Sequence, residues 1–321
     1  MKLLRLILFF ILLFSFAAKA QETAYFVETK SYQRAFGLTV ENDMFFQTDH
    51  YYSAGESIHF IHPAISKSPF NRLLISMFNL GDVVYNGLKI DHKIFTPTDT
   101  PNAGLKIGDR PYASSLSISQ FKVVENSEYA YRISSRFSLG IIGEYARGRE
   151  LQSKIHEITP SEVPLGWEYQ VKNDLLLNYY IKLDKGIYSS EYFEWLASAS
   201  VNLGTVNNDI AFSTNARVGL IDSYFESYSP GKNSGFRTWM ELSYKVKTIA
   251  YNAYLEGGLI NRNSPYIIEN GDMNRMSQKI GVHFFIQYNK HRIVFEGYRI
   301  SPEFVGALWH QWGGISYQYW F

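Results

Sequence analysis

Two segments of the chain combine residue types that support acid–base and ion chemistry. The first is the pair Asn42-Asp43, which follows the apolar positions Leu38 and Val40. Asn42 has the parity of those two residues, so in a strand it would share their apolar face. An amide and an adjoining carboxylate are costly on a lipid-facing surface unless they have a function. The alternative is that the strand has already ended and the pair caps a turn at its rim.

The second segment, residues 146–170, contains a histidine at helical spacing. Leu151 and Ile155 lie four residues apart, as do Gln152 and His156, so a short helix would place an apolar seam beside a polar one. Histidine is a common general base near neutral pH. A single histidine is more often an ordinary surface residue, so the spacing leaves both interpretations of His156 open.

A third group of charges lies at Asp109-Arg110-Pro111. Arg110 beside Asp109 is typical of a structural pair that fixes an external loop. Lys106, three residues before Asp109, adds positive charge of the kind that binds phosphate. Arg110 and Lys106 are therefore candidate substrate contacts, with the structural role as the alternative.

The elements that must position these residues repeat with a period of two. Residues 131–141 alternate between an apolar and a polar face, which indicates a strand with two different environments. The alternation returns in residues 193–204, 210–220, 240–247 and 315–321. Strands of about ten residues are long for a soluble sheet, where about five or six is usual.

Long alternating strands and an aromatic content of 17% favour a membrane barrel over a secreted soluble β-protein. In a membrane barrel the apolar face contacts lipid, the polar face lines the lumen, and aromatic residues gather at both interfaces. Closure also pairs every backbone group, as hydrocarbon requires. The predicted fold class is all-β: a transmembrane antiparallel β-barrel of about 12 strands, with both chain ends in the periplasm and a short helix in the external segment.

The strands are predicted at residues 35–43, 52–62, 88–96, 111–123, 130–145, 171–184, 191–206, 209–221, 236–250, 276–289, 291–302 and 311–321. The periplasmic connection 63–87 is unusually long. It carries apolar residues at helical spacing, namely Phe70, Leu73, Leu74, Met77 and Phe78. We therefore expect a short amphipathic helix there, acting as a plug or foot against the mouth of the barrel.

The N-terminus has the parts of a secretory signal peptide. Lys2 and Arg5 precede an apolar run over residues 6–16, and Ala18-Lys19-Ala20 supplies small residues for cleavage before Gln21. The run is shorter than the about 20 residues of a membrane-spanning helix. Residues 1–20 are predicted as the signal peptide and residues 21–321 as one outer-membrane barrel domain.

Composition excludes several function classes. The 31 Lys and Arg balance 30 Asp and Glu, so the chain lacks the basic surface that binds nucleic acid through phosphates. With no Cys, disulfides, thiol nucleophiles and Cys-bound zinc are excluded.

Four blocks of sequence, in order, resemble the lipid A 3'-O-deacylase family of Gram-negative outer-membrane β-barrels. The blocks are Glu41-Asn42-Asp43 with Tyr52-Ser53-Ala54-Gly55, Asp109-Arg110-Pro111-Tyr112-Ala113, Gln152-Ser153-Lys154-Ile155-His156, and Gly166-Trp167-Glu168-Tyr169-Gln170. They fall within residues 37–172. One departure is the segment 98–105, which has no cation where some members have a basic cluster. Lys106 or Arg110 would have to replace that phosphate contact.

The resemblance implies an esterase that removes the 3'-linked acyloxyacyl chain of lipid A with the help of Ca²⁺. It places the family's functional residues at Asn42, Asp43, Ser53 and His156. We expect His156 to deprotonate a water and Asp43 to hold Ca²⁺ together with backbone carbonyls. Asn42 would orient the base or donate to the oxyanion, and Ser53 would position water or substrate. The rival route makes Ser53 the nucleophile and His156 its base.

The expected partner is lipopolysaccharide in the outer leaflet, contacted by Arg110, Lys106 and Gln152. We expect a monomer rather than an oligomer. An outer-membrane phospholipase would share the ester chemistry and stays an alternative. A porin or channel is the other alternative, with a lumen lined by Arg132, Arg136, Lys245 and Lys247, although twelve strands make a narrow barrel that such side chains would fill.

Overall fold

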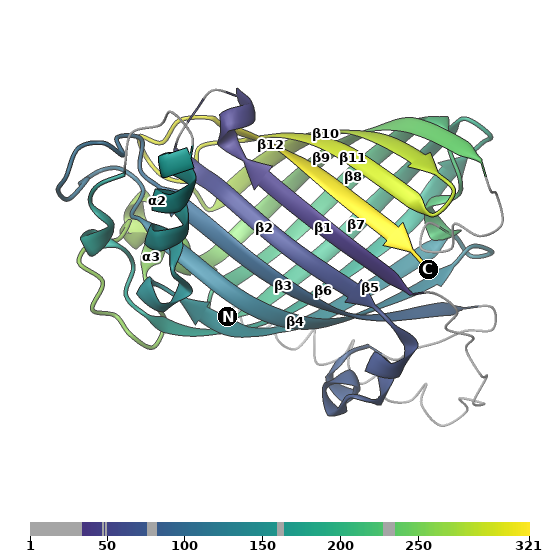
Figure 1. The fold of residues 1–321 in the computed structure, drawn as a ribbon, viewed down its shortest axis with the longest axis horizontal. Helices are drawn as coiled ribbons and strands as arrows, with labels where there is room; N and C mark the ends of the chain where they lie inside the picture. The colour runs from purple at the N-terminus through teal and green to yellow at the C-terminus, as the bar shows by residue number, and fades with distance from the viewer. Residues whose placement is uncertain (1–33, 47, 49, 76–81, 159–163, 227–234) are drawn as a thin grey trace, which may run out of the picture.

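The computed structural model describes residues 34–46, 48, 50–75, 82–158, 164–226 and 235–321. The predicted signal peptide lies outside the described residues. Twelve antiparallel strands form a closed barrel in which each strand pairs with its neighbours in sequence and β1 pairs with β12 (Figure 1). The predicted twelve-stranded barrel is confirmed. Within the described ranges, no helix has the length and apolar character needed to cross a membrane.

The strands are β1 (Ala35–Asn42), β2 (Tyr51–Ile61), β3 (Val83–Thr96), β4 (Ala113–Asn126), β5 (Tyr131–Ile142), β6 (Asp174–Ser189), β7 (Phe193–Gly204), β8 (Asn207–Leu220), β9 (Phe236–Asn252), β10 (Met276–Tyr288), β11 (His291–Ile300) and β12 (His310–Trp320). Two ends differ most from the prediction. β3 begins at Val83 rather than residue 88, and β6 ends at Ser189 rather than residue 184. In β6, a register shift between Gly186 and Tyr188 breaks the period of two that the prediction relied on.

Side chains alternate between the lipid-facing outer wall and the lumen. On β1, Phe36, Leu38 and Val40 are 38%, 39% and 43% exposed, whereas Ala35 is fully buried. Inside, large polar and aromatic side chains occupy the lumen. Arg132 forms an ion pair of 2.5 Å with Glu125 and lies 3.7 Å from the centre of the Tyr224 ring.

Apolar clusters fill parts of the lumen near both ends. The cluster near the periplasmic end contains Ala35, Ile61, Tyr85, Val123 and Trp320. The cluster near the extracellular end contains Ala113, Ile142, Val171, Leu176, Val206, Ala253 and Tyr254. The last two of these belong to the short helix α3 (Ala253–Glu256), which the sequence pattern did not predict.

The predicted helix in the external segment is present. β5 is followed by a 3-10 turn, η5 (Glu144–Ala146), by helix α2 (Gly148–Ile158), and by a second turn, η6 (Trp167–Tyr169), before β6. Figure 1 shows α2 beside the extracellular ends of the strands, outside the barrel. This location puts the helix where outer-leaflet lipid would meet it.

The long connection after β2 does not form the predicted amphipathic helix. Its described part, residues 62–75, contains two 3-10 turns, η3 (Pro63–Lys67) and η4 (Pro69–Leu73); Met77 and Phe78 lie outside the described residues. Ser68 between the turns is extended (φ −61°, ψ 140°), as is favoured directly before the proline Pro69. The proline therefore separates the apolar residues into two short turns.

Residues 62–75, called the periplasmic foot below, pack against the outer wall rather than across the barrel mouth (Figure 1). Gln120 and Lys122 have the parity of the exposed residues Leu116 and Ile118, and both donate hydrogen bonds to backbone carbonyls of the foot, at 3.3 and 3.4 Å. Ser135 accepts a hydrogen bond of 3.1 Å from a backbone N–H of the foot. The foot thus covers polar outward-facing residues of β4 and β5.

Candidate functional site

The end of β1 carries the first candidate pair. Asn42 has the outward parity of Leu38 and Val40, and its Oδ1 accepts a hydrogen bond of 2.7 Å from the N–H of Met44. The next residue, Asp43, starts the 3-10 turn η2 (Asp43–Phe46) and is 2% exposed. Its Oδ2 accepts a hydrogen bond of 2.7 Å from the N–H of His50. The outward position and the turn-capping role, left as alternatives by the sequence, therefore occur together.

The turn η2 presents an apolar surface beside Asp43. Met44, Phe45 and Phe46 are 57%, 55% and 42% exposed. The turn packs closely on β12 because Gly313 has no side chain: a Cβ there would lie 2.8 Å from the Cβ of Phe45. Exposed aromatic side chains beside a carboxylate form a suitable surface for a lipid with a polar head.

Ser53 lies in an irregularity of β2. The register with β3 shifts between Tyr52 and Ala54, so Ser53 departs from the alternation that would otherwise assign its face. Its side chain is 3% exposed, and its Oγ lies 2.5 Å from the Oγ1 of Thr96 on β3. Within the described residues, the hydroxyl has a threonine as its partner and not a histidine.

Helix α2 crosses the outer wall from β4 towards β2. At its start, Gly148 approaches Ser114 of β4 so closely that a Cβ on the glycine would lie 2.4 Å from the serine Cβ. Nearly one turn later, Leu151 packs on a buried cluster formed by Ala54, Ile94, Tyr112 and Trp167. The helix therefore begins over β4 and reaches the side chains of β3 and β2.

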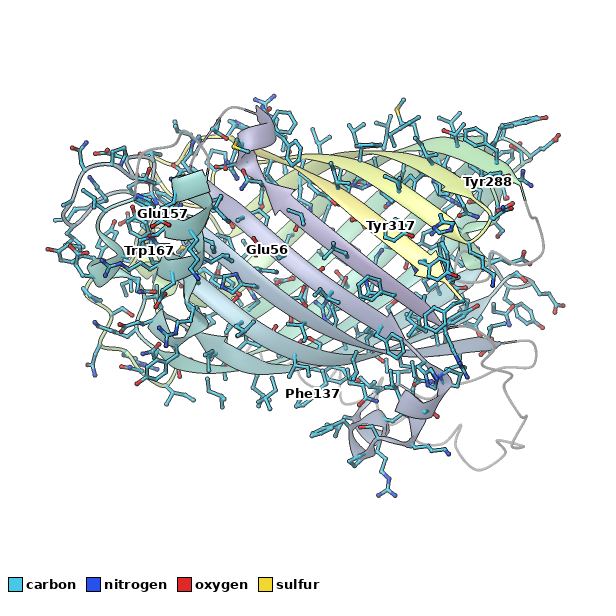
Figure 2. The ribbon with its side chains drawn as sticks, viewed as in Figure 1. Glu56, Phe137, Glu157, Trp167, Tyr288 and Tyr317 are labelled. Atoms are coloured by element: carbon cyan, nitrogen blue, oxygen red, sulfur yellow. The ribbon has the colours of Figure 1, made fainter. Side chains whose placement is uncertain are left out.

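This direction places the last turn of α2 towards the end of β1. His156 is partly buried in that turn, next to Glu157, which Figure 2 labels at this end of the helix. Asn42 pairs with Ala54 across β1 and β2, and Ala54 belongs to the buried cluster on which Leu151 packs. Asn42, Asp43 and Ser53 thus lie at adjacent strand ends beside the buried cluster on which α2 packs, and His156 lies in the last turn of that helix.

Gln152 is turned towards the wall rather than towards solvent. It is 3% exposed, and its Oε1 accepts a hydrogen bond of 3.0 Å from the indole N–H of Trp167. Its Nε2 is buried and has no hydrogen-bond partner among the residues that the structure describes. The geometry shows Gln152 as part of the packing beneath α2, and its contact with substrate stays a prediction.

Arg110 is directed into the lumen, and Lys106 lies in the connection between β3 and β4. Arg110 is 2% exposed, pairs with Glu303 at 2.7 Å, and lies 4.4 Å from the centre of the lumenal Phe95 ring. Burial on its own raises the pKa of Glu303, but the charges of Arg110 and Lys247, with the hydrogen bond from Arg110, together leave that pKa below its ordinary value. Lys106 pairs with Asp99 at 2.8 Å. Both cations thus have the structural role that the sequence left open, and their contact with substrate stays a prediction.

Asp43 can be tested as a calcium ligand by the chemistry of its surroundings. Among the described residues, no group of three or more His, Cys, Asp and Glu side chains could hold a metal ion. The backbone carbonyl of Asp43 accepts hydrogen bonds from Thr48, and its carboxylate is buried. Carboxylate and carbonyl oxygens are the donors that Ca²⁺ prefers. The donor type fits calcium, with one carboxylate to which carbonyls, water or substrate would be added.

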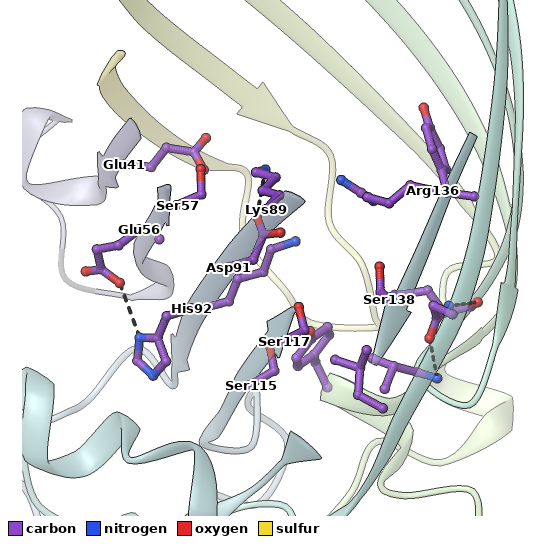
Figure 3. A pocket seen from close by; sticks show the side chains of 18 of the residues that line it. Glu41, Glu56, Ser57, Lys89, Asp91, His92, Ser115, Ser117, Arg136 and Ser138 are labelled. Carbon is purple, nitrogen blue, oxygen red and sulfur yellow. Dashed lines mark hydrogen bonds and ion pairs between the residues drawn. The ribbon is translucent and has the colours of Figure 1, made fainter. Parts of the chain in front are cut away.

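The sequence reasoning missed a polar pair on the same wall, Glu56 and His92. Glu56 has the parity of Ile58 on β2, and His92 has the parity of Ile90 on β3; these isoleucines are 47% and 48% exposed. The His92 Nδ1 lies 3.2 Å from the Glu56 Oε2, as the dashed line in Figure 3 marks. Polar residues at apolar positions of two predicted strands were the available signal.

Comparison with known proteins gives a family and a fold. The family described as "Outer membrane protein LpxR" matches residues 6–321. No curated protein sequence matches the chain significantly. The structure of LpxR from Salmonella typhimurium superposes with a TM-score of 0.70 at 17% identity, covering 89% of this chain and 100% of that chain. At this identity the likeness concerns the fold.

Two autotransporter domains are less similar. The β domain of the Bordetella autotransporter BrkA has a TM-score of 0.45 at 8% identity and covers 89% of this chain and 98% of that chain. The translocator domain of the autotransporter NalP from Neisseria meningitidis has a TM-score of 0.42 at 7% identity. The match covers 91% of this chain and 89% of that chain.

Proposed function

The chain belongs to the outer membrane protein LpxR family, and on that premise we propose that it is a lipid A deacylase: an outer-membrane esterase that removes the 3'-linked acyloxyacyl chain. The observation that carries the proposal is the position of α2. The helix packs on the lipid-facing wall over a cluster that contains Ala54, the cross-strand neighbour of Asn42, which supports a site shared by His156, Asn42 and Asp43. A hydrolytic site in this position can reach a lipid that stays in the outer leaflet.

In the proposed reaction, His156 takes a proton from a water that attacks the acyl carbonyl, and later returns a proton to the leaving alkoxide. Asn42 orients the base or donates to the oxyanion. Asp43 is the residue that would hold Ca²⁺, which when bound supplies positive charge near the acyl carbonyl. The exposed turn η2 provides an apolar surface for acyl chains beside these groups.

The surroundings of Ser53 support water as the nucleophile. A serine nucleophile needs a base within hydrogen-bond reach, and the Ser53 Oγ is instead buried against Thr96 at 2.5 Å. A serine in this position can fix the strand ends beneath the substrate. We therefore assign Ser53 a positioning role in the proposal, with acylation of Ser53 as the rival route.

The substrate and assembly state belong to the same proposal: lipopolysaccharide as the partner and a monomer as the working unit. A phospholipase would use the same chemistry on another lipid and is distinguished by experiment. The lumen gives a channel little support, because side chains such as Arg132 and Tyr224 occupy it.

The test is mass spectrometry of lipid A from a host that expresses the wild type, His156→Ala or His291→Ala, with and without added Ca²⁺ before extraction. His291 is a matched control: an outward-facing histidine on β11, bonded to Tyr317 and remote from α2. We expect loss of the 3'-acyloxyacyl mass with the wild type and with the control, but not with His156→Ala. Unchanged lipid A with an inserted wild-type barrel would refute the proposal, and loss of phospholipid instead would indicate the phospholipase.

A further inference from the structure

The pair formed by Glu56 and His92 is unusual for its location. Both residues lie at lipid-facing positions, and the exposed fractions of their side chains are 30% and 13%. Ionisable side chains on such a surface are costly and are kept where they have a partner and a function. This pair has a third partner, because the His92 Nε2 lies 2.8 Å from the backbone carbonyl of Ala146.

The two contacts of His92 determine how many protons the His92–Glu56 pair must carry. The Ala146 carbonyl can only accept a hydrogen bond, so Nε2–H is the donor there. The ionised Glu56 carboxylate is also an acceptor, so both contacts are hydrogen bonds only when the pair carries one further proton, on His92 or on Glu56. In that state the pair has no net charge, which suits a lipid-facing surface.

The carbonyl that His92 contacts stands at the start of α2. Ala146 ends η5, two residues before Gly148 begins the helix. Between them the chain bends at Arg147, whose backbone is in the left-handed region at φ 63°. Within this bend, His92 provides a side-chain attachment to the barrel wall, close to where the direction of the helix is set.

We propose that His92 and Glu56 are positioning residues that hold the start of α2 against the wall and thereby set the place of His156. The part that concerns the helix stands alone, whereas the effect on catalysis rests on the proposed function. His92 is not itself the catalytic base, because both ring nitrogens are engaged. Thr96, the hydrogen-bond partner of Ser53, lies on the same strand as His92, four residues further along β3. At roughly 3.3 Å per residue, the two positions are about 13 Å apart.

The helix position can be measured with spin labels, because the chain has no native cysteine. One label is placed on α2 at Lys154→Cys and the other on the turn after β4 at Glu128→Cys, both at exposed positions. Distances between the two spin labels are measured by double electron–electron resonance in detergent micelles. We expect a narrow distribution in the doubly labelled parent and a distribution at least twice as broad in His92→Leu or Glu56→Leu.

Two variants separate positioning from general damage. Glu56→Gln should keep the parent distribution, because its amide can donate to a neutral His92 that still donates to Ala146. His291→Leu, which removes an outward-facing histidine far from α2, should also leave it unchanged. Heat-dependent migration on gels verifies that each barrel is folded. A parent-like distribution in folded His92→Leu, or equal broadening in His291→Leu, would overturn the inference.

An activity measurement links the pair to the proposed chemistry. A displacement of about 1 Å in a catalytic group can cost on the order of 10²-fold in rate. We expect His92→Leu to lower kcat on lipid A by at least about tenfold with KM little changed. Glu56→Gln should retain most of the parent kcat. If the parent itself does not deacylate lipid A, the proposed function fails while the distance result stands. Normal kcat with a displaced helix would refute the link to catalysis.

Discussion

Two segments fold back onto the outer wall, and they cover it in different ways. At the extracellular end, α2 buries the side chains of Leu151, Gln152 and Trp167 against β2 to β4. At the periplasmic end, the foot uses mainly backbone groups to satisfy Gln120, Lys122 and Ser135. Side-chain packing on a buried cluster holds α2 on the wall, whereas the foot meets the wall with backbone groups as well as with the side chains of Phe70 and Leu74. On the proposed function, the first cover is the one that places a reactive group, the side chain of His156.

The largest difference between the two covers should appear in activity. Replacing His156 with alanine should lower the rate of lipid A deacylation by about 10² to 10⁴, the usual cost of losing a general base. Phe70→Ala in the foot, which removes a ring stacked on Phe137 at 5.9 Å, should leave the rate within about twofold. Acyl-chain release from purified lipid A in micelles measures both. Comparable losses in the two variants would mean that the covers are not functionally distinct.

The packing beneath α2 should show the next largest effect. Trp167 is 1% exposed, and replacing a buried aromatic residue with alanine commonly costs about 3–5 kcal/mol. We expect amide hydrogen exchange in residues 148–158 of Trp167→Ala to rise by at least about 10²-fold, since 1.4 kcal/mol is about tenfold. Exchange in the foot should not change. Retained protection of α2 would show that the helix is held by other contacts.

A smaller effect is expected for Ser53→Ala, which tests whether water or Ser53 is the nucleophile in the site beside α2. If water attacks, loss of the hydrogen bond to Thr96 should cost a modest factor, below about tenfold, in keeping with about 1 kcal/mol for one hydrogen bond. Thr96→Val, which removes the partner hydroxyl, should have a similar effect. Complete loss in Ser53→Ala alone, or an acylated Ser53 trapped on quenching, would establish the rival route.

The smallest effect is expected in the foot. Ser135→Ala removes the acceptor of one backbone N–H, that of Ile75, which is worth about 1 kcal/mol. Exchange of that amide should accelerate by about fivefold, while the amides of α2 and the rate of deacylation stay at the wild-type values. Loss of activity in this variant would indicate communication between the two covers, which the structure gives no reason to expect.

The sequence predicted the barrel well because alternation is a local property. Each strand shows its own period of two, and Asn42 could be assigned to the lipid side from Leu38 and Val40 alone. The pattern that predicted α2 was also local, since Leu151 and Ile155 lie four residues apart and share one face of the helix. Pro69 was visible in the sequence too, but the prediction of a helix in the foot gave it too little weight.

What the sequence could not predict depends on partners distant in the chain. The start of β3 was missed because Val84 and Asn86 are outward-facing residues that lie buried, at 5% and 3% exposed, which an alternation of exposed apolar residues does not anticipate. Arg110 was interpreted as a rim cation because Glu303, its partner in the lumen, lies 193 residues away. Ser53 was hidden by a register shift that no single strand displays.

The occupied lumen has a consequence for the cell. Arg132 stacked on Tyr224 and the apolar clusters near both ends occupy much of the lumen among the described residues. On the proposed function, a cell could therefore insert many copies of this protein and remodel its surface while the filled barrels add little open passage across it. Resistance to large antibiotics should depend on the altered lipid and not on the number of barrels.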